Sequence, residues 1–331
     1  MRNAPPDRSP PARAGAAPGG AGPQAPERAD ALLRRLEWTA LRRLDGLLQG
    51  NYRTLARGSG LDLADLREYQ PEDDVRHIDW NVTARLQAPH VRVFTEEREM
   101  GACFVLDRSA SVDFGSGVRT KRTVQTEFTG LVARLLTRHG NRVGALLGDD
   151  AGARWIPSRG GRAQVLHLLH ALQQPQPAAA RGGAAAGTRL GAWLDAAGRA
   201  LKRRATVFVV SDFISPPGWE RPLARLAERH DVVAVRLYDP LEQALPDIGL
   251  VTLRDAETGE QLLVDTHDRL FRQRFARIAA AREDALRTAL GHAGVDAVEL
   301  STDDGLPEAV MRFAEQRRRR SRLRGAPSRV A

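Results

Sequence analysis

Residues 103–111, with the sequence CFVLDRSAS, begin as a short apolar run and end in the pattern D-x-S-x-S. The apolar run predicts a buried strand, and the polar residues predict a loop at its carboxyl end, where open α/β sheets bind ligands. Asp107, Ser109 and Ser111 offer one carboxylate and two hydroxyls. Such hard oxygen ligands suit Mg²⁺ or Mn²⁺ better than zinc, so the pattern indicates a divalent metal site. The alternative is an ordinary turn or helix N-cap, because Ser and Asp are common in both.

A second stretch, residues 205–213 (ATVFVVSDF), repeats the design of an apolar, β-branched run that ends in an acid, here Asp212. The carboxyl ends of parallel strands share one edge of a sheet, so Asp107 and Asp212 are expected to converge there. Thr188 opens an amphipathic segment after a linker and offers a third hydroxyl. The alternative is that Thr188 is a plain N-cap and that Asp212 caps the next helix.

Taken together, these residues resemble the metal-ion-dependent adhesion site of von Willebrand factor type A domains, which uses D-x-S-x-S, a Thr and a distant Asp in that order. The resemblance implies that Asp107, Ser109, Ser111, Thr188 and Asp212 bind one Mg²⁺ or Mn²⁺. It also implies that an Asp or Glu of another protein completes the coordination of the ion.

A second resemblance lies upstream, in residues 58–80 (GSGLDLADLREYQPEDDVRHIDW), 83–85 (TAR) and 91–94 (VRVF). This segment resembles the signature of domain of unknown function family 58, which pairs it with a type A-like domain, and the resemblance covers residues 35–300. Members of that family are commonly encoded beside MoxR-type AAA+ ATPases. The resemblance therefore implies a role with such an ATPase, or with its client, in the chaperone-like assembly or maturation of protein complexes.

The signature segment places opposite charges around one large aromatic side chain. Its residues of interest are Tyr69, Asp73, Asp74, Arg76, Asp79, Trp80 and Arg85. One interpretation is a structural cap, held by salt bridges and hydrogen bonds, that fixes the N-terminal segment onto the sheet. The other is a recognition surface for a partner.

The order of predicted elements indicates an α/β fold with a doubly wound, mostly parallel sheet, one antiparallel edge strand and an N-terminal family-specific segment. The apolar periodicity predicts helices over 118–139, 161–174, 190–203, 219–230 and 267–292, and hairpins over 142–156 and 250–264. Leucines at helical spacing predict an earlier helix that ends near Gly50. We expect a disordered lead (1–28), an N-terminal helix with the signature segment (29–100), a type A-like domain (101–315) and an Arg-rich tail (316–331).

Composition argues against several classes of protein. The net charge of +9 is concentrated at the ends, since residues 317–331 hold seven Arg and no acid, and 48 of the 50 basic residues are Arg. This distribution makes nucleic acid an unlikely partner of the folded domain. Cys103 is the only cysteine, which excludes a disulfide within the chain and is compatible with the cytoplasm. No apolar run reaches the ~18 residues that a transmembrane helix needs.

The enzymatic alternative is a phosphohydrolase of the haloacid dehalogenase class, which also places an Asp at the end of its first strand. That chemistry uses a second Asp two residues later as general acid, and Ser109 occupies that position. Without that acid the leaving group has no proton donor. We therefore expect a binding protein rather than an enzyme, with the phosphohydrolase and an anion-binding Arg-rich tail kept as alternatives.

Overall fold

A six-stranded sheet with the spatial order β10-β7-β6-β3-β4-β5 forms the centre of the protein. This computed structural model describes residues 25–37, 63–70, 75, 78–94, 101–150, 152–175, 189–254 and 259–325. The strands of the sheet are β3 (Ala102–Asp107), β4 (Val143–Asp149), β5 (Gly152–Arg159), β6 (Thr206–Ser211), β7 (Asp231–Tyr238) and β10 (Asp296–Ser301).

The pairing of these strands is parallel except at one edge. β3 pairs in parallel with β4 and β6, and β7 pairs in parallel with β6 and β10. β5 returns antiparallel to β4 and lies at the edge of the sheet. This arrangement confirms the expected α/β, von Willebrand factor type A-like fold with one antiparallel edge strand.

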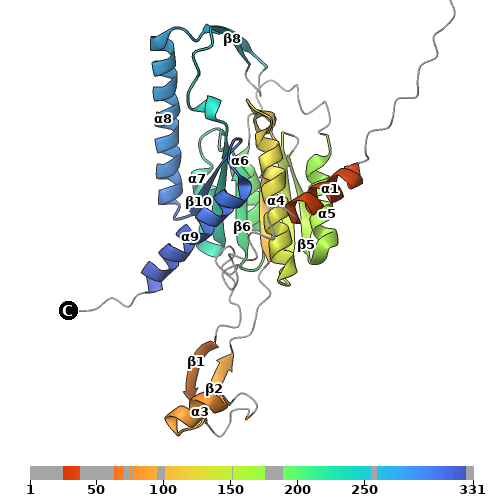
Figure 1. The fold of residues 1–331 in the computed structure, drawn as a ribbon, viewed down its shortest axis with the longest axis vertical. Coiled ribbons are helices and arrows are strands. Elements are labelled where there is room, and N and C mark those ends of the chain that lie inside the picture. Colours follow the sequence, from red (N-terminus) through yellow and green to blue (C-terminus); the bar gives the residue numbers. More distant parts are fainter. Residues whose placement is uncertain are drawn as a thin grey trace, which may run out of the picture.

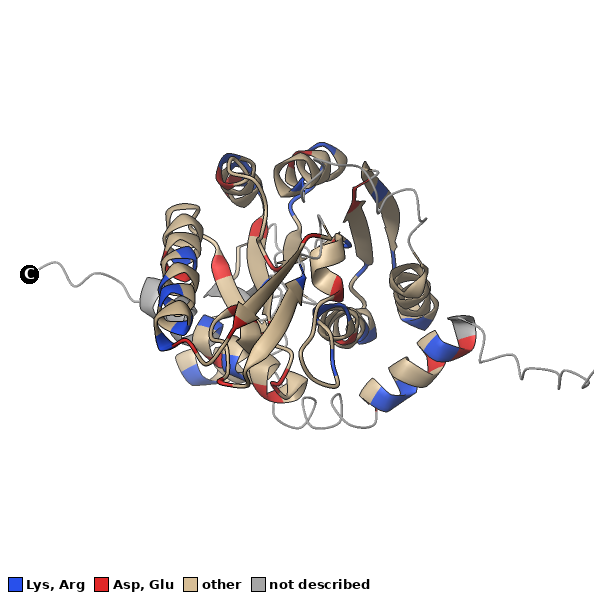
Figure 2. Ribbon diagram, turned by 90° about the horizontal axis from the view of Figure 1, so that it is seen from above, with Lys and Arg blue, Asp and Glu red and all other residues tan. Residues whose placement is uncertain are grey.

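Helices cover both faces of the sheet, as Figures 1 and 2 show from two directions. Side chains alternate along β3, so Phe104 and Leu106 enter one core cluster while Cys103 and Val105 enter the other. The first cluster includes side chains of α1 (Ala25–Leu36), α4 (Lys121–Arg138), α5 (Gly161–Gln173) and α9 (Leu306–Gly325). The second includes side chains of α6 (Leu190–Ala200), α7 (Glu220–Arg229) and the C-terminal part of α8 (Arg269–His292).

The end of β4 is held very close to α6. A Cβ atom on Gly148 would lie 2.2 Å from the Trp193 ring, so the position has room for glycine alone. Gly148 is the register partner of Asp107 on β3, and its carbonyl accepts a hydrogen bond of 2.7 Å from the Arg108 amide. Packing of Trp193 therefore helps to fix the backbone next to the D-x-S-x-S loop.

Two small antiparallel pairs of strands lie outside the central sheet. β8 (Leu250–Arg254) and β9 (Gln261–Asp265) form the expected hairpin between β7 and α8. β1 (Leu63–Glu68) pairs with β2 (His90–Phe94), with helix α3 (Trp80–Leu86) between them in the chain. Figure 1 shows this second unit apart from the layers of the core.

Two helices cross the domain boundaries that we expected from the sequence. Helix α1 begins at Ala25, inside the expected lead, and its buried Leu33 packs in the core of the type A-like domain. Helix α9 continues through the expected start of the tail at residue 316. Arg317 is only 3% exposed and pairs with Asp231 and Asp296, so these two aspartates hold the first arginine of the Arg-rich run in the fold.

None of the helices in the described part of the chain carries an apolar stretch long enough to span a lipid bilayer.

Candidate functional site

Two neighbouring strands bring Asp107 and Asp212 together. β3 and β6 pair in parallel with Leu106 opposite Val210, so both chains leave the sheet side by side at the same edge. Asp107 is 1% exposed and Asp212 is also buried. The predicted convergence of two carboxylates from distant parts of the sequence is thus present in the structure.

Hydroxyl groups surround the Asp107 carboxylate. Ser109 donates to Asp107 Oδ1 from its Oγ (2.6 Å) and from its backbone N–H (2.8 Å). Ser211, at the end of β6, donates to Asp107 Oδ2 at 2.6 Å. Ser111 Oγ lies 3.0 Å from Ser109 Oγ, so three side chains of the D-x-S-x-S pattern form one continuous set of oxygens.

The spacing of these oxygens can be compared with the geometry of a magnesium site. An octahedral ion with metal–oxygen distances of ~2.0–2.1 Å places adjacent ligands about 2.9 Å apart. The separations are 2.6 Å from Asp107 Oδ1 to Ser109 Oγ and 3.0 Å from there to Ser111 Oγ. One carboxylate and two hydroxyls at this spacing fit a small hard cation such as Mg²⁺ or Mn²⁺.

A buried lysine lies beside this set of oxygens. Lys121 is 1% exposed, and its Nζ donates to Asp212 Oδ2 at 2.7 Å and to Glu242 Oε1 at 2.6 Å. The other oxygen of Asp212 accepts from the Ile214 amide at 3.0 Å. Both oxygens of Asp212 are therefore engaged, which favours contact with an ion through a water molecule.

The lysine also joins the site to the end of β7. Glu242, in the short 3-10 helix Pro240–Glu242, accepts from the backbone N–H of Asp239 at 3.0 Å. The buried Asp239 carboxylate accepts from the backbone and hydroxyl of Ser116 and from the hydroxyl of Thr302. These contacts hold the loop that follows D-x-S-x-S against the ends of β7 and β10.

Burial and charge shift the pKa values of these groups in different directions. Burial, with a further contribution from the charge of Asp212, raises the pKa of Asp107 to about 7. Burial alone would lower the pKa of Lys121, but the charges of Asp212 and Glu242 raise it above its ordinary value. Burial would likewise raise the pKa of Asp239, yet the hydrogen bonds from Ser116, Thr302 and Leu241 hold it below its usual range.

Several predicted site residues lie outside the described residues. Among the proposed metal ligands this applies to Thr188, so its role as a ligand stays a prediction. In the signature segment it applies to Asp73, Asp74 and Arg76.

The described part of the signature segment differs from the expected cap around Trp80. Trp80 is 70% exposed, and Arg85 on the same short helix is exposed as well. Asp79 is buried because its carboxylate caps α3, accepting from the amides of Asn81 and Val82. Tyr69 is half-buried, and its amide donates to the Pro89 carbonyl at 2.8 Å. The exposed indole does not support a cap centred on Trp80, and the role of the segment, as a cap or as a recognition surface, stays a prediction.

Sequence reasoning missed three groups of the site: Ser211, Lys121 and Glu242. Ser211 directly precedes Asp212, and strand alternation could have placed its hydroxyl beside Asp107. Lys121 had a different signal, because it is one of only two lysines in a chain that otherwise uses Arg for positive charge. No local pattern distinguishes Glu242 from other acids in a turn.

Comparison with known proteins gives the chain a family. The sequence profile described as "Protein of unknown function DUF58" matches residues 65–285. The chain belongs to the DUF58 family. Within the described residues of this DUF58 protein, no three His, Cys, Asp or Glu side chains form a metal-binding cluster.

Relatives of this DUF58 protein occur in mycobacteria. The protein Mb1516 of Mycobacterium bovis is 40% identical over 294 residues, which cover 87% of this chain and 90% of the relative. The protein MAV169 of Mycobacterium avium is 38% identical over 169 residues, which cover 50% of this chain and 94% of the relative.

Solved structures with some similarity include BatB from Bacteroides thetaiotaomicron, with a TM-score of 0.41 and 16% identity, covering 66% of this chain and 99% of BatB. The VWA domain of SpRpn10 matches with a TM-score of 0.38 and 15% identity, covering 65% of this chain and 95% of that domain.

The first prediction concerns the buried lysine. Lys121→Met removes the cation that faces Asp212 and leaves a buried carboxylate unpaired, which should lower the free energy of unfolding by about 3–5 kcal/mol. Adding Asp212→Asn should recover part of this loss. Urea denaturation measures both, and Lys202→Met, at the exposed second lysine, is the control and should change stability by less than about 0.5 kcal/mol. A Lys121→Met protein as stable as the wild type would contradict the pairing.

The second prediction concerns the stability of the metal-free protein, measured in chelator, as a function of pH. The folded protein keeps a proton on Asp107 up to a pKa of about 7, whereas the unfolded carboxyl releases it near its ordinary value of 3.8. Because the folded state binds more protons between these values, stability should fall as pH rises from 4 to 7. Asp107→Asn should flatten this dependence and should be more stable than the wild type at pH 8. If stability depends on pH in the same way in the wild type and in Asp107→Asn, Asp107 has an ordinary pKa. The control is Asp284→Asn, on an exposed helix surface.

Proposed function

We propose that this DUF58 protein is a metal-dependent protein–protein interaction module. The metal is Mg²⁺ or Mn²⁺, with Asp107, Ser109, Ser111 and Thr188 as oxygen ligands and Asp212 as a ligand directly or through water. The observation that carries the proposal is the convergence of Asp107, Ser109 and Ser111 within hydrogen-bond distance of one another, beside Asp212, at one edge of the sheet.

The composition of the site supports a ligand from outside. Hydroxyls are neutral, and one of the two carboxylates is already paired with Lys121. A divalent ion bound there keeps much of its charge and prefers six ligands. An Asp or Glu of another protein supplies both the charge and the oxygen that are missing.

The partner that we propose is a MoxR-type AAA+ ATPase, or a client of that ATPase, in the chaperone-like assembly or maturation of protein complexes. The support is the family resemblance, together with a site built for one external carboxylate. We propose the cytoplasm as the compartment, which is where such an ATPase acts.

Two other functions are less well supported by the site. A haloacid dehalogenase-like phosphohydrolase needs a second acid near Asp107. Ser109 stands at the required position, and its hydroxyl donates a hydrogen bond to Asp107. The Arg-rich tail has one arginine fewer with which to bind an anionic surface or nucleic acid, because Arg317 is buried between two aspartates.

The metal site is tested by calorimetry with Mn²⁺. The wild-type protein should bind one ion with modest affinity, and the double variant Asp107→Ala, Ser109→Ala should release no binding heat. The matched control is Asp284→Ala, Thr288→Ala, which removes the same kinds of oxygen from the exposed surface of α8. Thr188→Ala alone should weaken binding if Thr188 is a ligand. Equal heats for the wild type and the Asp107, Ser109 variant would show that no ion binds there.

The role of the metal in partner binding is tested with a purified MoxR-type AAA+ ATPase from the same organism. The DUF58 protein should retain the ATPase in Mg²⁺ and should release it when EDTA removes the metal. A chain that ends at Arg317 should still bind, because it keeps the buried ion pairs and lacks the six arginines that follow. A different result would assign the interaction to charge steering by the tail. In that case the ATPase would stay bound in EDTA, would dissociate steeply as the salt concentration rises and would not bind the truncated chain.

A further inference from the structure

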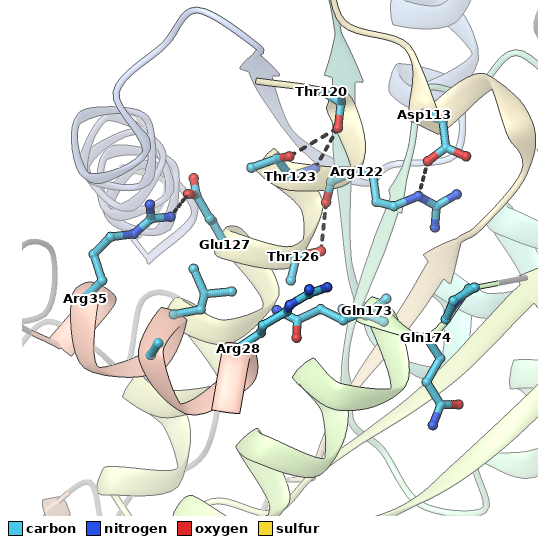
Figure 3. A pocket seen from close by; sticks show the side chains of 14 residues that line it. Arg28, Arg35, Asp113, Thr120, Arg122, Thr123, Thr126, Glu127, Gln173 and Gln174 are labelled. Carbon is cyan, nitrogen blue, oxygen red and sulfur yellow. Dashed lines mark hydrogen bonds and ion pairs between the residues drawn. The ribbon is translucent and has the colours of Figure 1, made fainter. Parts of the chain in front are cut away.

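A second site is formed by a pocket of about 690 Å³ between α1, α4 and the end of α5. Figure 3 shows the side chains that line it. None of Asp107, Ser109, Ser111 and Asp212 belongs to its lining. Its volume lies in the range that accommodates small ligands or a few residues of a peptide.

The pocket has an excess of positive charge. Arg28, Arg35 and Arg122 line it together with Asp113 and Glu127. Glu127 pairs with Arg35 and also with Arg119, which lies just outside the lining, while Asp113 pairs with Arg122. Three guanidinium groups and two carboxylates therefore line the pocket, and Arg119 pairs with one of these carboxylates from outside the lining.

Arg28 supplies the charge that is available to a ligand. It makes no ion pair with any residue that the structure describes, and Figure 3 shows its side chain lying across the pocket. A guanidinium group in this position can form paired hydrogen bonds with a carboxylate.

Other groups in the lining restrict the chemistry of the ligand further. Gln173 carries a buried side-chain oxygen without a hydrogen-bond partner in the described structure, and such an acceptor requires an N–H or O–H donor. Leu32, Leu172 and Pro175 give the same pocket an apolar wall. Carboxylates, N–H donors and apolar side chains occur together in an acidic peptide, whereas inorganic phosphate offers no apolar group.

The neighbouring segments of the chain itself do not have this chemistry. Residues 38–62, which follow α1, contain four Arg and two Asp, and residues 176–188, which follow α5, contain one Arg and no acid. Both segments carry net positive charge, so the charge of the pocket favours an occupant from another molecule.

The pocket also adjoins the candidate metal site. Asp113 lies in the short 3-10 helix Ala110–Asp113, which includes Ser111. Arg122 lies with its Nη2 3.4 Å from the carbonyl oxygens of Arg108 and Ser109. The D-x-S-x-S loop therefore carries the candidate metal ligands and also contacts a side chain of the pocket.

We propose that this pocket binds an acidic peptide segment, with Arg28 pairing to a carboxylate of the peptide and the Gln173 oxygen accepting from one of its N–H groups. The pocket recognises the peptide by its own residues. To assign the peptide to the partner at the metal site would be a further step, and only that step rests on the proposed function.

The test uses an array of fluorescein-labelled octapeptides composed of Glu, Asp, Leu, Ser and Gly, each paired with an analogue in which every acid is replaced by its amide. Fluorescence polarisation in chelator measures binding without metal. The wild-type protein should bind a subset of acidic peptides and should prefer them to their amide analogues. Arg28→Gln should weaken this binding about tenfold, and Arg28→Glu should weaken it further.

Arg274→Gln, at an exposed arginine of α8, is the matched control and should bind like the wild type. Thermal melting verifies that the Arg28 variants remain folded. The proposal is overturned if no acidic peptide binds, if amide analogues bind equally well, or if both Arg28 variants retain full affinity.

A second measurement separates this site from the metal site. The Asp107→Ala, Ser109→Ala variant should bind the peptides in chelator as the wild type does, even if Mn²⁺ binding is lost. Peptide binding that depends on Mn²⁺ and on Asp107, but not on Arg28, would assign the peptide to the metal site and overturn the pocket. Normal peptide binding by a protein that binds no Mn²⁺ would support the pocket while the metal proposal fails.

Discussion

Two carboxylates held side by side out of water are the constraint on which the site depends. Asp107 and Asp212 end adjacent strands, and their mutual repulsion is unfavourable in a buried setting. Two features offset it: hydroxyls of Ser109 and Ser211 donate to Asp107, and the ammonium of Lys121 pairs with Asp212. The two acids are therefore stabilised differently, Asp107 by hydroxyl donors and Asp212 by a cation.

The lysine extends this constraint into the surrounding loops. Through Glu242 it contacts the turn after β7, and through Asp239 that turn holds Ser116 and Thr302. The same turn leads to the β8–β9 hairpin, which is an addition to the alternating strands and helices. Loops outside the D-x-S-x-S pattern thus depend on the contacts that position Asp212.

Much of the fold and the centre of the site could be predicted from the sequence, because both follow from local patterns. Apolar runs that end in Asp fix β3 and β6, and the parallel pairing of such strands then brings Asp107 near Asp212. Lys121 could not be found in this way, since a lysine in the first turn of a helix is normally exposed and its partners lie 91 and 121 residues away. Trp80 is the opposite case: a large aromatic side chain among charges suggested a packed centre, yet the indole is 70% exposed in the structure.

The charges of the described residues also determine the net charge that would surround a bound metal ion. Asp107, Asp212 and Glu242 contribute three negative charges when ionised, and Lys121 contributes one positive charge, so their sum balances a divalent ion. Only Asp107 of these acids presents an oxygen beside the hydroxyls of Ser109 and Ser111, while Asp212 and Glu242 each direct one oxygen to the lysine and the other to a backbone amide. The ion would thus be neutralised over the whole site but poorly compensated in its immediate shell. Such a distribution would stabilise a metal-loaded protein and would still leave the ion attractive to a carboxylate from a partner, as the proposed function requires.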